Sequence, residues 1–297
     1  MGAREFFLLA AAGGTGTAML GIVTLQQANG QQAPAGPQQS SGTGTVSENN
    51  GQDFTRPETL LQLRYIYLTA PGGGSLPGTI RTVTTDTVVL RSDVKINLAP
   101  QWILALRGDL PFAARDPIKL DNPAGGYVYG LRDADVQAAL IKQLDARWAA
   151  GAGLRIIAPT GAEDLTSGKW KALPIVGARV MLPELSEGSF FTALLRYDVS
   201  FAGDPSSRDI SNLQIAPTLK VVLPDRWFVT LYPEPDIRYN FGDPITGQTG
   251  RLFLPMDFLV GRAVTKSVAL SLEIGVPMIQ DYPVYDFKTV TRLNVKF

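Results

Sequence analysis

The sequence predicts an all-β fold, a transmembrane antiparallel up-and-down β-barrel of about 12 strands. Three observations predict it. Apolar and polar residues alternate with a period of two along much of the chain, which turns one face of each strand toward lipid and the other toward a polar lumen. Past the N-terminal segment, no apolar stretch is long enough for a spanning helix. Short and long connections between the expected strands alternate strictly.

The alternation is clearest in the last segment, 284–297. The residues on its more apolar face are Tyr285, Phe287, Thr289, Thr291, Leu293, Val295 and Phe297. The segments with the same pattern are 88–98, 101–112, 190–201, 227–241 and 268–278, and the pattern is weakest in 58–69 and 166–182. We expect 284–297 to close the barrel by pairing with 57–69, because a lipid-exposed edge leaves backbone groups unpaired.

Turn residues divide the chain into connections of two lengths. Short turns are expected at Ala99-Pro100, Leu144-Asp145, 183–188, Pro224-Asp225 and 264–266. Longer loops are expected at 70–79, 113–126, 159–168, 203–209, 242–250 and 279–283. Outer-membrane barrels have short periplasmic turns and longer external loops. With an even number of strands, both termini are therefore expected in the periplasm.

The N-terminal segment predicts export. Arg4 supplies a basic start, and an apolar run continues from Phe6 to about Leu25. We predict a signal peptide over residues 1–28; a membrane anchor is the alternative, which the run 13–17 of Gly and Thr disfavours. Residues 29–55 are rich in Gln, Gly, Ser and Asn and predict a flexible periplasmic leader. A plug that enters the barrel is the alternative for the leader, and the barrel is assigned residues 56–297.

Composition excludes several functions. Lys plus Arg and Asp plus Glu each number 27, so the basic excess of a nucleic-acid binder is absent. The chain contains no Cys and no His, which rules out a Ser-His catalytic arrangement. We expect no enzyme, no cofactor and no metal. The carboxylate pairs Asp133/Asp135 and Glu234/Asp236 remain as candidates for acid–base chemistry, but ion pairing with inward arginines is the preferred interpretation.

Aromatic residues lie near the ends of the expected strands. They are Trp102, Trp148, Trp170, Trp227, Tyr127, Tyr129, Tyr239, Phe241, Tyr282 and Tyr285. Rings with an apolar body and a polar handle prefer the membrane–water interface. We predict that these residues form aromatic girdles; ordinary core packing is the alternative.

The polar faces of the strands carry charges of both signs. The candidate channel residues expected to line the lumen are Arg91, Asp93, Arg107, Asp109, Asp135, Arg155, Arg196, Asp198, Glu234, Asp236, Arg238, Asp257, Glu273 and Arg292, with Lys95, Arg147 and Lys220 on the same face. Mixed charge narrows a lumen and favours small solutes over bulk flow.

The segments 252–261, 271–277 and 281–287 resemble one family, the outer-membrane transporter-like barrels named for the phenol meta-degradation (MetA) pathway. The segments 159–161 and 130–133 look similar as well, although Arg132 stands where that family usually has Gly. The match covers residues 125–297. It implies an outer-membrane barrel for hydrophobic or aromatic compounds.

The chain end resembles an assembly signal. Phe297, with Leu293 and Val295 alternating before it, is similar to the signal that the barrel-assembly machinery reads. The predicted function is passive transport of small solutes through a narrow mixed-charge lumen. The alternative is a structural or partner-binding barrel with a closed lumen, whose leader tethers a periplasmic partner. The expected surroundings are outer-membrane lipid and lipopolysaccharide, with no nucleic acid.

Overall fold

A computed structural model describes residues 53–71, 82–117, 122, 124–232, 237–244, 250–282 and 284–297. The signal peptide predicted over 1–28 and most of the leader, 29–52, lie outside these ranges. The described residues fold as strands joined by turns and loops. None of them belongs to a helix that is long and apolar enough to cross a bilayer.

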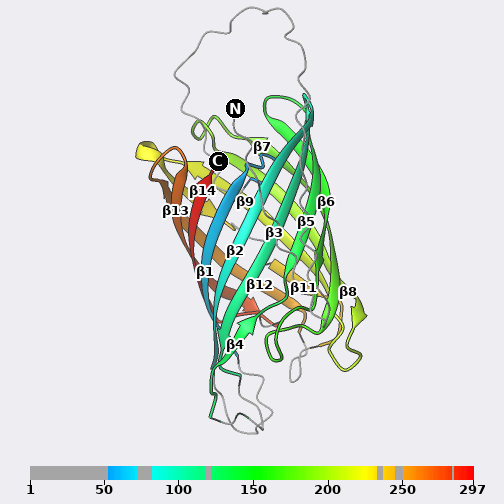
Figure 1. Cartoon of the computed structure of the whole chain (residues 1–297). Helices are drawn as coiled ribbons and strands as arrows, with labels where there is room; N and C mark the ends of the chain where they lie inside the picture. The colour runs from blue at the N-terminus through cyan, green and yellow to red at the C-terminus, as the bar shows by residue number, and fades with distance from the viewer. Residues whose placement is uncertain are drawn as a thin grey trace, which may run out of the picture. The chain divides into compact units, whose positions relative to one another are not determined.

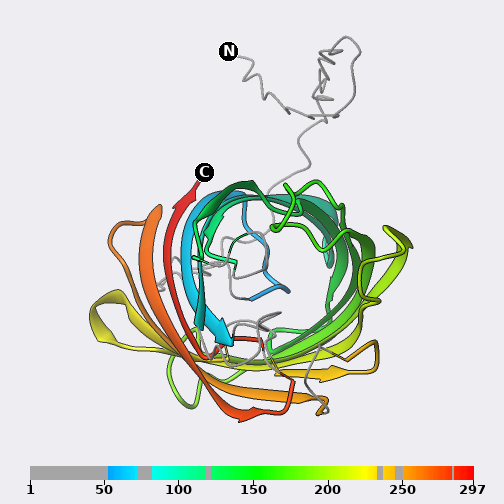
Figure 2. The same ribbon diagram turned by 90° about the horizontal axis from the view of Figure 1, so that it is seen from below.

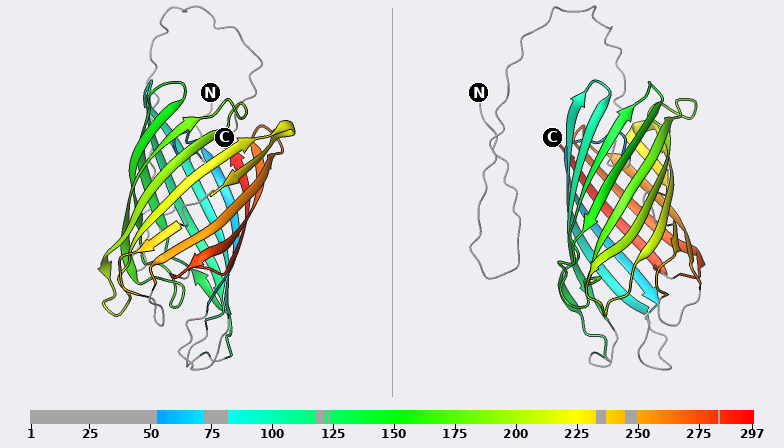
Figure 3. Two further views of the ribbon diagram at one scale, coloured as in Figure 1. Left: turned by 180° about the vertical axis from the view of Figure 1, so that it is seen from behind. Right: turned by 90° about the vertical axis from the view of Figure 1, so that its right-hand side faces the viewer.

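The described strands form one antiparallel sheet. They are β1 (Leu60–Pro71), β2 (Thr82–Ala99), β3 (Trp102–Arg115), β4 (Val128–Leu131), β5 (Asp135–Gln143), β6 (Trp148–Ile157), β7 (Lys169–Met181), β8 (Phe190–Gly203), β9 (Ser211–Val222), β10 (Trp227–Leu231), β11 (Ile237–Asn240), β12 (Leu252–Ala263), β13 (Val268–Gln280) and β14 (Phe287–Lys296). They run at a tilt around the barrel (Figures 1 and 3). A 3-10 turn, Pro224–Arg226, connects β9 to β10.

Two of the barrel strands are interrupted. β4 and β5 both pair with β3, and β10 and β11 both pair with β9 and β12. Fourteen segments therefore occupy twelve positions around the barrel, since two pairs each count once. The predicted antiparallel barrel of about twelve strands is confirmed.

The barrel closes between its first and last strands. β14 pairs with β1 from Lys296 opposite Leu60 to Phe287 opposite Thr69, as the sequence predicts. The backbone N–H of Phe297 extends the ladder by donating to the carbonyl of Thr59 at 3.1 Å. Seen end-on, the strands form a continuous ring in which the last strand lies beside the first (Figure 2). This pairing joins the first and last strands, so the backbone groups of β1 and β14 bond to each other and do not face lipid unpaired.

The connections separate into two sets, one at each end of the barrel. Short turns join β2 to β3, β5 to β6, β7 to β8, β9 to β10 and β12 to β13; we call this the short-turn end. The longer connections, from β1 to β2, β3 to β5, β6 to β7, β8 to β9, β11 to β12 and β13 to β14, lie at the long-loop end. The expected connections fall between these strands, although residues 72–79 of the first loop lie outside the described ranges.

One short turn shows why these connections can be tight. The Asp145 carboxylate accepts hydrogen bonds from the backbone N–H groups of Arg147 and Trp148, both at 2.7 Å. These bonds satisfy turn donors that have no ladder partner. Because they favour the charged carboxylate, they lower the pKa of Asp145 below its ordinary value.

Burial alternates along the strands as the period-two pattern requires. In β1, Leu61 and Leu63 are exposed while Gln62 and Arg64 are buried, so the apolar side chains face outward and the polar ones inward. This arrangement is the reverse of that in a water-soluble protein, and it is the one that a lipid environment favours. The same order recurs around the ring, where outward-facing Leu90, Leu195, Phe258, Leu272 and other large apolar residues are exposed.

Exposed aromatic residues lie near both ends of the barrel. Trp102, Trp148 and Trp227 begin strands at the short-turn end, and Trp170, Tyr127, Tyr129, Tyr239 and Phe241 lie toward the long-loop end. At the short-turn end, Lys142 Nζ lies 5.3 Å from the centre of the Trp102 ring, and Arg262 Cζ lies 5.4 Å from that of Trp227. Cations whose stems lie on apolar surface beside aromatic rings are typical of a membrane interface.

Two aromatic assignments are wrong. Tyr282 and Tyr285 were expected in a girdle, and Tyr285 on the outward face, but both are buried and pack with Phe253. The strand begins only at Phe287, so the inward and outward alternation of β14 does not determine the direction of the Tyr285 side chain. Its hydroxyl donates to Asp257 at 2.6 Å, a partner that lipid would not offer.

The exposed terminal ring allows a test of assembly. Phe297 is 75% exposed and follows the outward phase of β14. Phe297→Ser should lower the amount of folded barrel in the outer membrane without blocking export, because the ring is not part of the packed interior. Heat-modifiability of outer-membrane fractions on gels measures this, with Tyr129→Ser as an equally exposed control at the other end. An unchanged folded yield would contradict a role for Phe297 in assembly.

Candidate functional site

The inner face of the barrel carries most of the predicted channel residues. Among the described residues, the alternation turns inward Arg91, Asp93, Arg107, Asp109, Asp135, Arg155, Arg196, Asp198, Arg238, Asp257, Glu273 and Arg292. Glu234 and Asp236 lie outside the described residues. Leu293, Val295 and Phe297 lie on the outward phase of β14.

The first cluster of inward charges spans β2, β3, β5 and β6. Arg91 donates to both oxygens of Asp109 at 2.7 and 2.6 Å, and Arg155 bridges Asp109 at 3.1 Å and Asp135 at 2.5 Å. Arg107 and Asp93 form a neighbouring pair at 2.6 Å. Two-pronged arginine–carboxylate contacts are strong and geometrically restrictive, so this cluster fixes the wall over four adjacent strands.

The second cluster lies on β12, β13 and β14. Glu273 accepts from Lys288 at 2.8 Å and from Arg292. Lys288 also lies 3.4 Å from Asp257, which accepts the hydroxyl proton of Tyr285. Asp257 and Glu273 have no exposed side-chain surface. Such buried carboxylates require these partners, because an unpaired charge away from water is costly.

A third group of inward polar residues is not paired within the wall. Lys171 on β7 and Asp198 on β8 form no ion pair with each other or with any other described residue. Asn212 lies directly across from Asp198 on β9, and an oxygen of each is buried without a hydrogen-bond partner in the described structure. This place on the inner wall therefore offers a cation and two acceptors that only water or a solute can satisfy.

Two expected inward charges are placed differently. Arg147 belongs to a short turn, where its side chain is 48% exposed and pairs with Glu184 at 2.7 Å. Its inward position was inferred from the alternation of β6, but that strand begins only at Trp148. Lys95 keeps the inward phase of β2, but it lies near the short-turn end and is exposed. Lys220 is buried on the inner face of β9, 4.5 Å from the centre of the Phe228 ring.

The carboxylate pair Asp133/Asp135 does not form an acid–base dyad. Asp133 accepts from the hydroxyls of Thr166 and Ser167, both at 2.6 Å, and from the Ser167 backbone N–H at 2.8 Å. It therefore fixes the β6–β7 loop, while Asp135 pairs with Arg155. Within the described ranges, no three acidic side chains come together as a metal ion would need.

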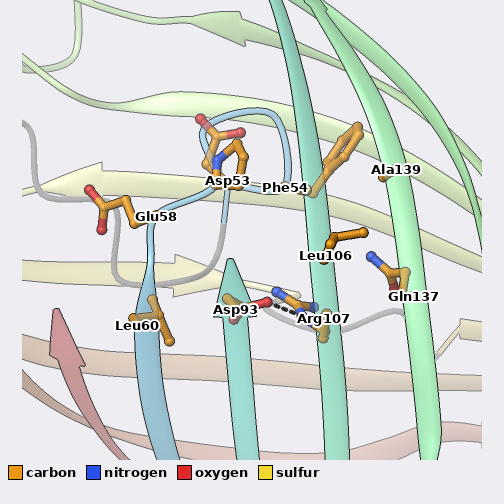
Figure 4. A pocket seen from close by; sticks show the side chains of 11 residues that line it. Asp53, Phe54, Glu58, Leu60, Asp93, Leu106, Arg107, Gln137 and Ala139 are labelled. Atoms are coloured by element: carbon orange, nitrogen blue, oxygen red, sulfur yellow. Dashed lines mark hydrogen bonds and ion pairs between the residues drawn. The ribbon is translucent and has the colours of Figure 1, made fainter. Parts of the chain in front are cut away.

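A segment that precedes β1 lies inside the ring of strands, at the short-turn end (Figure 2). Asp53 is buried and pairs with Arg179 of β7 at 3.2 Å. A cavity of about 20 Å³ remains between this segment and β2, β3 and β5 (Figure 4). Since one water molecule needs at least ~10–15 Å³ of such space, this cavity holds little more than one.

Sequence reasoning missed three parts of this interior. Lys171 lies in the segment where alternation is weakest, so its inward position had no clear signal. Tyr285 lies just outside a strand. The placement of Asp53 and Phe54 depends on contacts with strands about one hundred or more residues away. The sequence offers a plug only as the alternative interpretation of residues 29–55, which include these two residues.

Comparisons with known proteins give only distant likenesses. No family model matches the sequence, and no curated protein matches it. The translocator domain of the autotransporter NalP from Neisseria meningitidis has a TM-score of 0.45 at 10% identity, with 84% of this chain and 91% of that chain covered. The NanC porin has a TM-score of 0.45 at 13% sequence identity, with 80% of this chain and 98% of the porin chain covered. The β-domain of the Bordetella autotransporter BrkA has a TM-score of 0.45 at 14% sequence identity, with 81% of this chain and 100% of the β-domain chain covered.

At these TM-scores the likenesses carry no argument about family or activity. The barrel assignment rests on the strand pairing itself, and the resemblance to the phenol meta-degradation barrels stays a prediction.

The first charge cluster should contribute measurably to stability. Asp109→Asn removes the carboxylate shared by Arg91 and Arg155, and we expect a loss of about 1–3 kcal/mol in the free energy of unfolding. The matched control, Arg147→Gln, breaks an exposed ion pair and should cost less than ~1 kcal/mol. Urea titration of the folded band in detergent measures both. Equal effects would show that the inward cluster is no more important than a surface pair.

Proposed function

We propose that the chain is an outer-membrane channel that passes small solutes passively through a narrow lumen lined by both signs of charge. The short-turn end and both termini would face the periplasm. The closed ring, the outward apolar face and the aromatic residues near both ends support a membrane location. The polar inner face supports a water-accessible path.

One observation carries the transport proposal. Most inward charges of the described strands are paired within the wall, whereas the charged Lys171 and Asp198 are not, and the amide oxygen of Asn212 beside Asp198 has no hydrogen-bond partner there. A wall that served only to hold its strands together would gain by pairing these groups. Unpaired donors and acceptors on neighbouring strands favour transient contacts with a passing polar or charged group, which suits selection without tight binding.

Catalysis is the less favoured proposal. The chain has no His to act as a base, and Asp133 is fully engaged in holding a loop. The sequence resemblance adds a hydrophobic or aromatic solute class to the proposal. A closed structural barrel remains the alternative outcome of the experiment below.

Assembly belongs to the same proposal. The outward Phe297, Val295 and Leu293 would present the terminal strand to the barrel-assembly machinery. Lipopolysaccharide and outer-membrane lipid would surround the apolar face. A periplasmic partner held by the leader is a further expectation of the sequence.

The channel proposal can be tested in planar bilayers with purified protein. Discrete conductance steps are expected, and their ion selectivity should depend on the unpaired inward charges. Asp198→Asn removes an inward negative charge and should shift the reversal potential in a salt gradient toward anion preference. Lys171→Gln should shift it toward cation preference, which makes each variant the control for the other. No conductance in any variant, including one that lacks residues 53–58, would overturn the channel function.

A further inference from the structure

The segment 53–57 crosses the barrel interior. It joins β1 through Glu58 and Thr59, yet the Phe54 ring packs against Ile175, Leu194 and Ala216. These three residues lie on β7, β8 and β9. In the order of the twelve-position ring, β8 lies six positions from β1, which is directly opposite. The chain therefore reaches from one wall to the other before it enters the sheet.

The segment holds its own shape. One Asp53 carboxylate oxygen accepts from the Thr55 backbone N–H at 2.9 Å and from the Thr55 hydroxyl at 2.6 Å. The other accepts from Arg56 Nε at 2.8 Å, and Arg56 N–H donates to the Asp53 carbonyl at 3.2 Å. Pro57, whose φ is fixed by its ring, follows this turn. An aspartate-capped turn of this kind is preorganised, so little entropy is lost when it docks.

The wall has a place shaped for the Phe54 ring. A Cβ atom at Gly177 would lie 2.7 Å from Phe54 Cζ, and one at Gly151 would lie 3.1 Å from Phe54 Cε2. Both glycines are on the inward phase of their strands, β7 and β6. Only residues without a side chain leave room for the ring there. The aromatic ring thus fills a hollow that the wall itself provides.

Polar contacts hold the segment beside this hollow. Arg179 Nη1 lies 3.2 Å from the buried Asp53 carboxylate, and Gln143 Nε2 donates to the Thr55 carbonyl at 2.7 Å. Arg56 lies over the Phe190 ring, 5.9 Å from its centre. Gln143, Arg179 and Phe190 lie near the short-turn ends of β5, β7 and β8. The docking site is therefore at the mouth of the barrel where the termini lie.

We propose that residues 53–57 are a tethered plug that docks in this site and closes the short-turn mouth, and that its release opens the path. The proposal rests on the channel function proposed above. The hollow at Gly151 and Gly177 recognises the ring of Phe54, and Arg179 recognises the carboxylate of Asp53. The small cavity left beside the plug (Figure 4) has room for about one water molecule. The docked plug thus blocks solutes on that side of the mouth.

Position can be tested independently of conduction, because the chain has no Cys. Thr55→Cys places a single thiol at a position with no exposed surface, and Leu185→Cys places one on an exposed turn at the same end. A water-soluble maleimide should label the folded Thr55→Cys protein at least tenfold more slowly than the folded Leu185→Cys protein. Adding Phe54→Ala to Thr55→Cys should restore fast labelling. Equal labelling rates for the two single-Cys proteins would overturn the docking site.

Conduction then tests closure. Phe54→Ala and Arg179→Gln should each raise the fraction of time the channel is open by severalfold, with heat-modifiability confirming a folded barrel. Phe253→Ala removes an equal ring from the inner wall at the long-loop end and should leave that fraction unchanged. Slow labelling with an open fraction that neither variant changes would overturn closure while the channel function stands. A barrel that stays silent with the plug deleted, while the labelling pattern holds, would instead overturn the channel function and support the docking site.

Discussion

The closing ladder between β1 and β14 is the constraint on which the rest of the structure depends. Backbone N–H and C=O groups in hydrocarbon have no water to bond with, and each unpaired group costs several kcal/mol. Ten residue pairs join the two strands, from Leu60 with Lys296 to Thr69 with Phe287. A slip of one residue in this ladder would turn the inward residues of one of the two strands, such as Arg64 of β1, toward lipid. Closure therefore fixes register, and register fixes which residues face the lumen.

Once register is fixed, the interior must accommodate the charges that alternation sends there. The barrel does this by pairing them across neighbouring strands. Arg155 reaches two carboxylates on two strands, and Glu273 receives two cations from β14. The Arg155–Asp135 bridge joins two strands that the backbone ladder also joins, whereas the Arg155–Asp109 bridge spans the strand between β6 and β3, so the bridges tie together more than nearest neighbours. Burial of the charges in these two clusters is tolerable because each of them has a strong partner.

The sequence predicts the parts of this structure that follow from local pattern. Period-two alternation identifies the strand faces, and turn residues such as Asp145 identify the connections, so topology and closure follow. Pattern fails where regular structure ends: Arg147 lies in a turn and Tyr285 lies just before β14, and neither obeys the phase of its neighbouring strand. β11 keeps the inward phase of β10, so Arg238 is inward although β10 and β11 are separate strands. Placement of Asp53 needs the complete fold, because its partner Arg179 is 126 residues away.

The proposed plug explains the unusual composition of β6, which the sequence pattern alone does not explain. From Ala149 to Gly153, β6 consists solely of Ala and Gly, an unfavourable composition for a strand that must also pack. Its inward members, Ala149, Gly151 and Gly153, would leave an empty hollow if nothing occupied the lumen there. Voids of that kind forfeit packing contacts. The Phe54 ring occupies the hollow, so small residues in the wall and a large one in the leader are two halves of one packing arrangement.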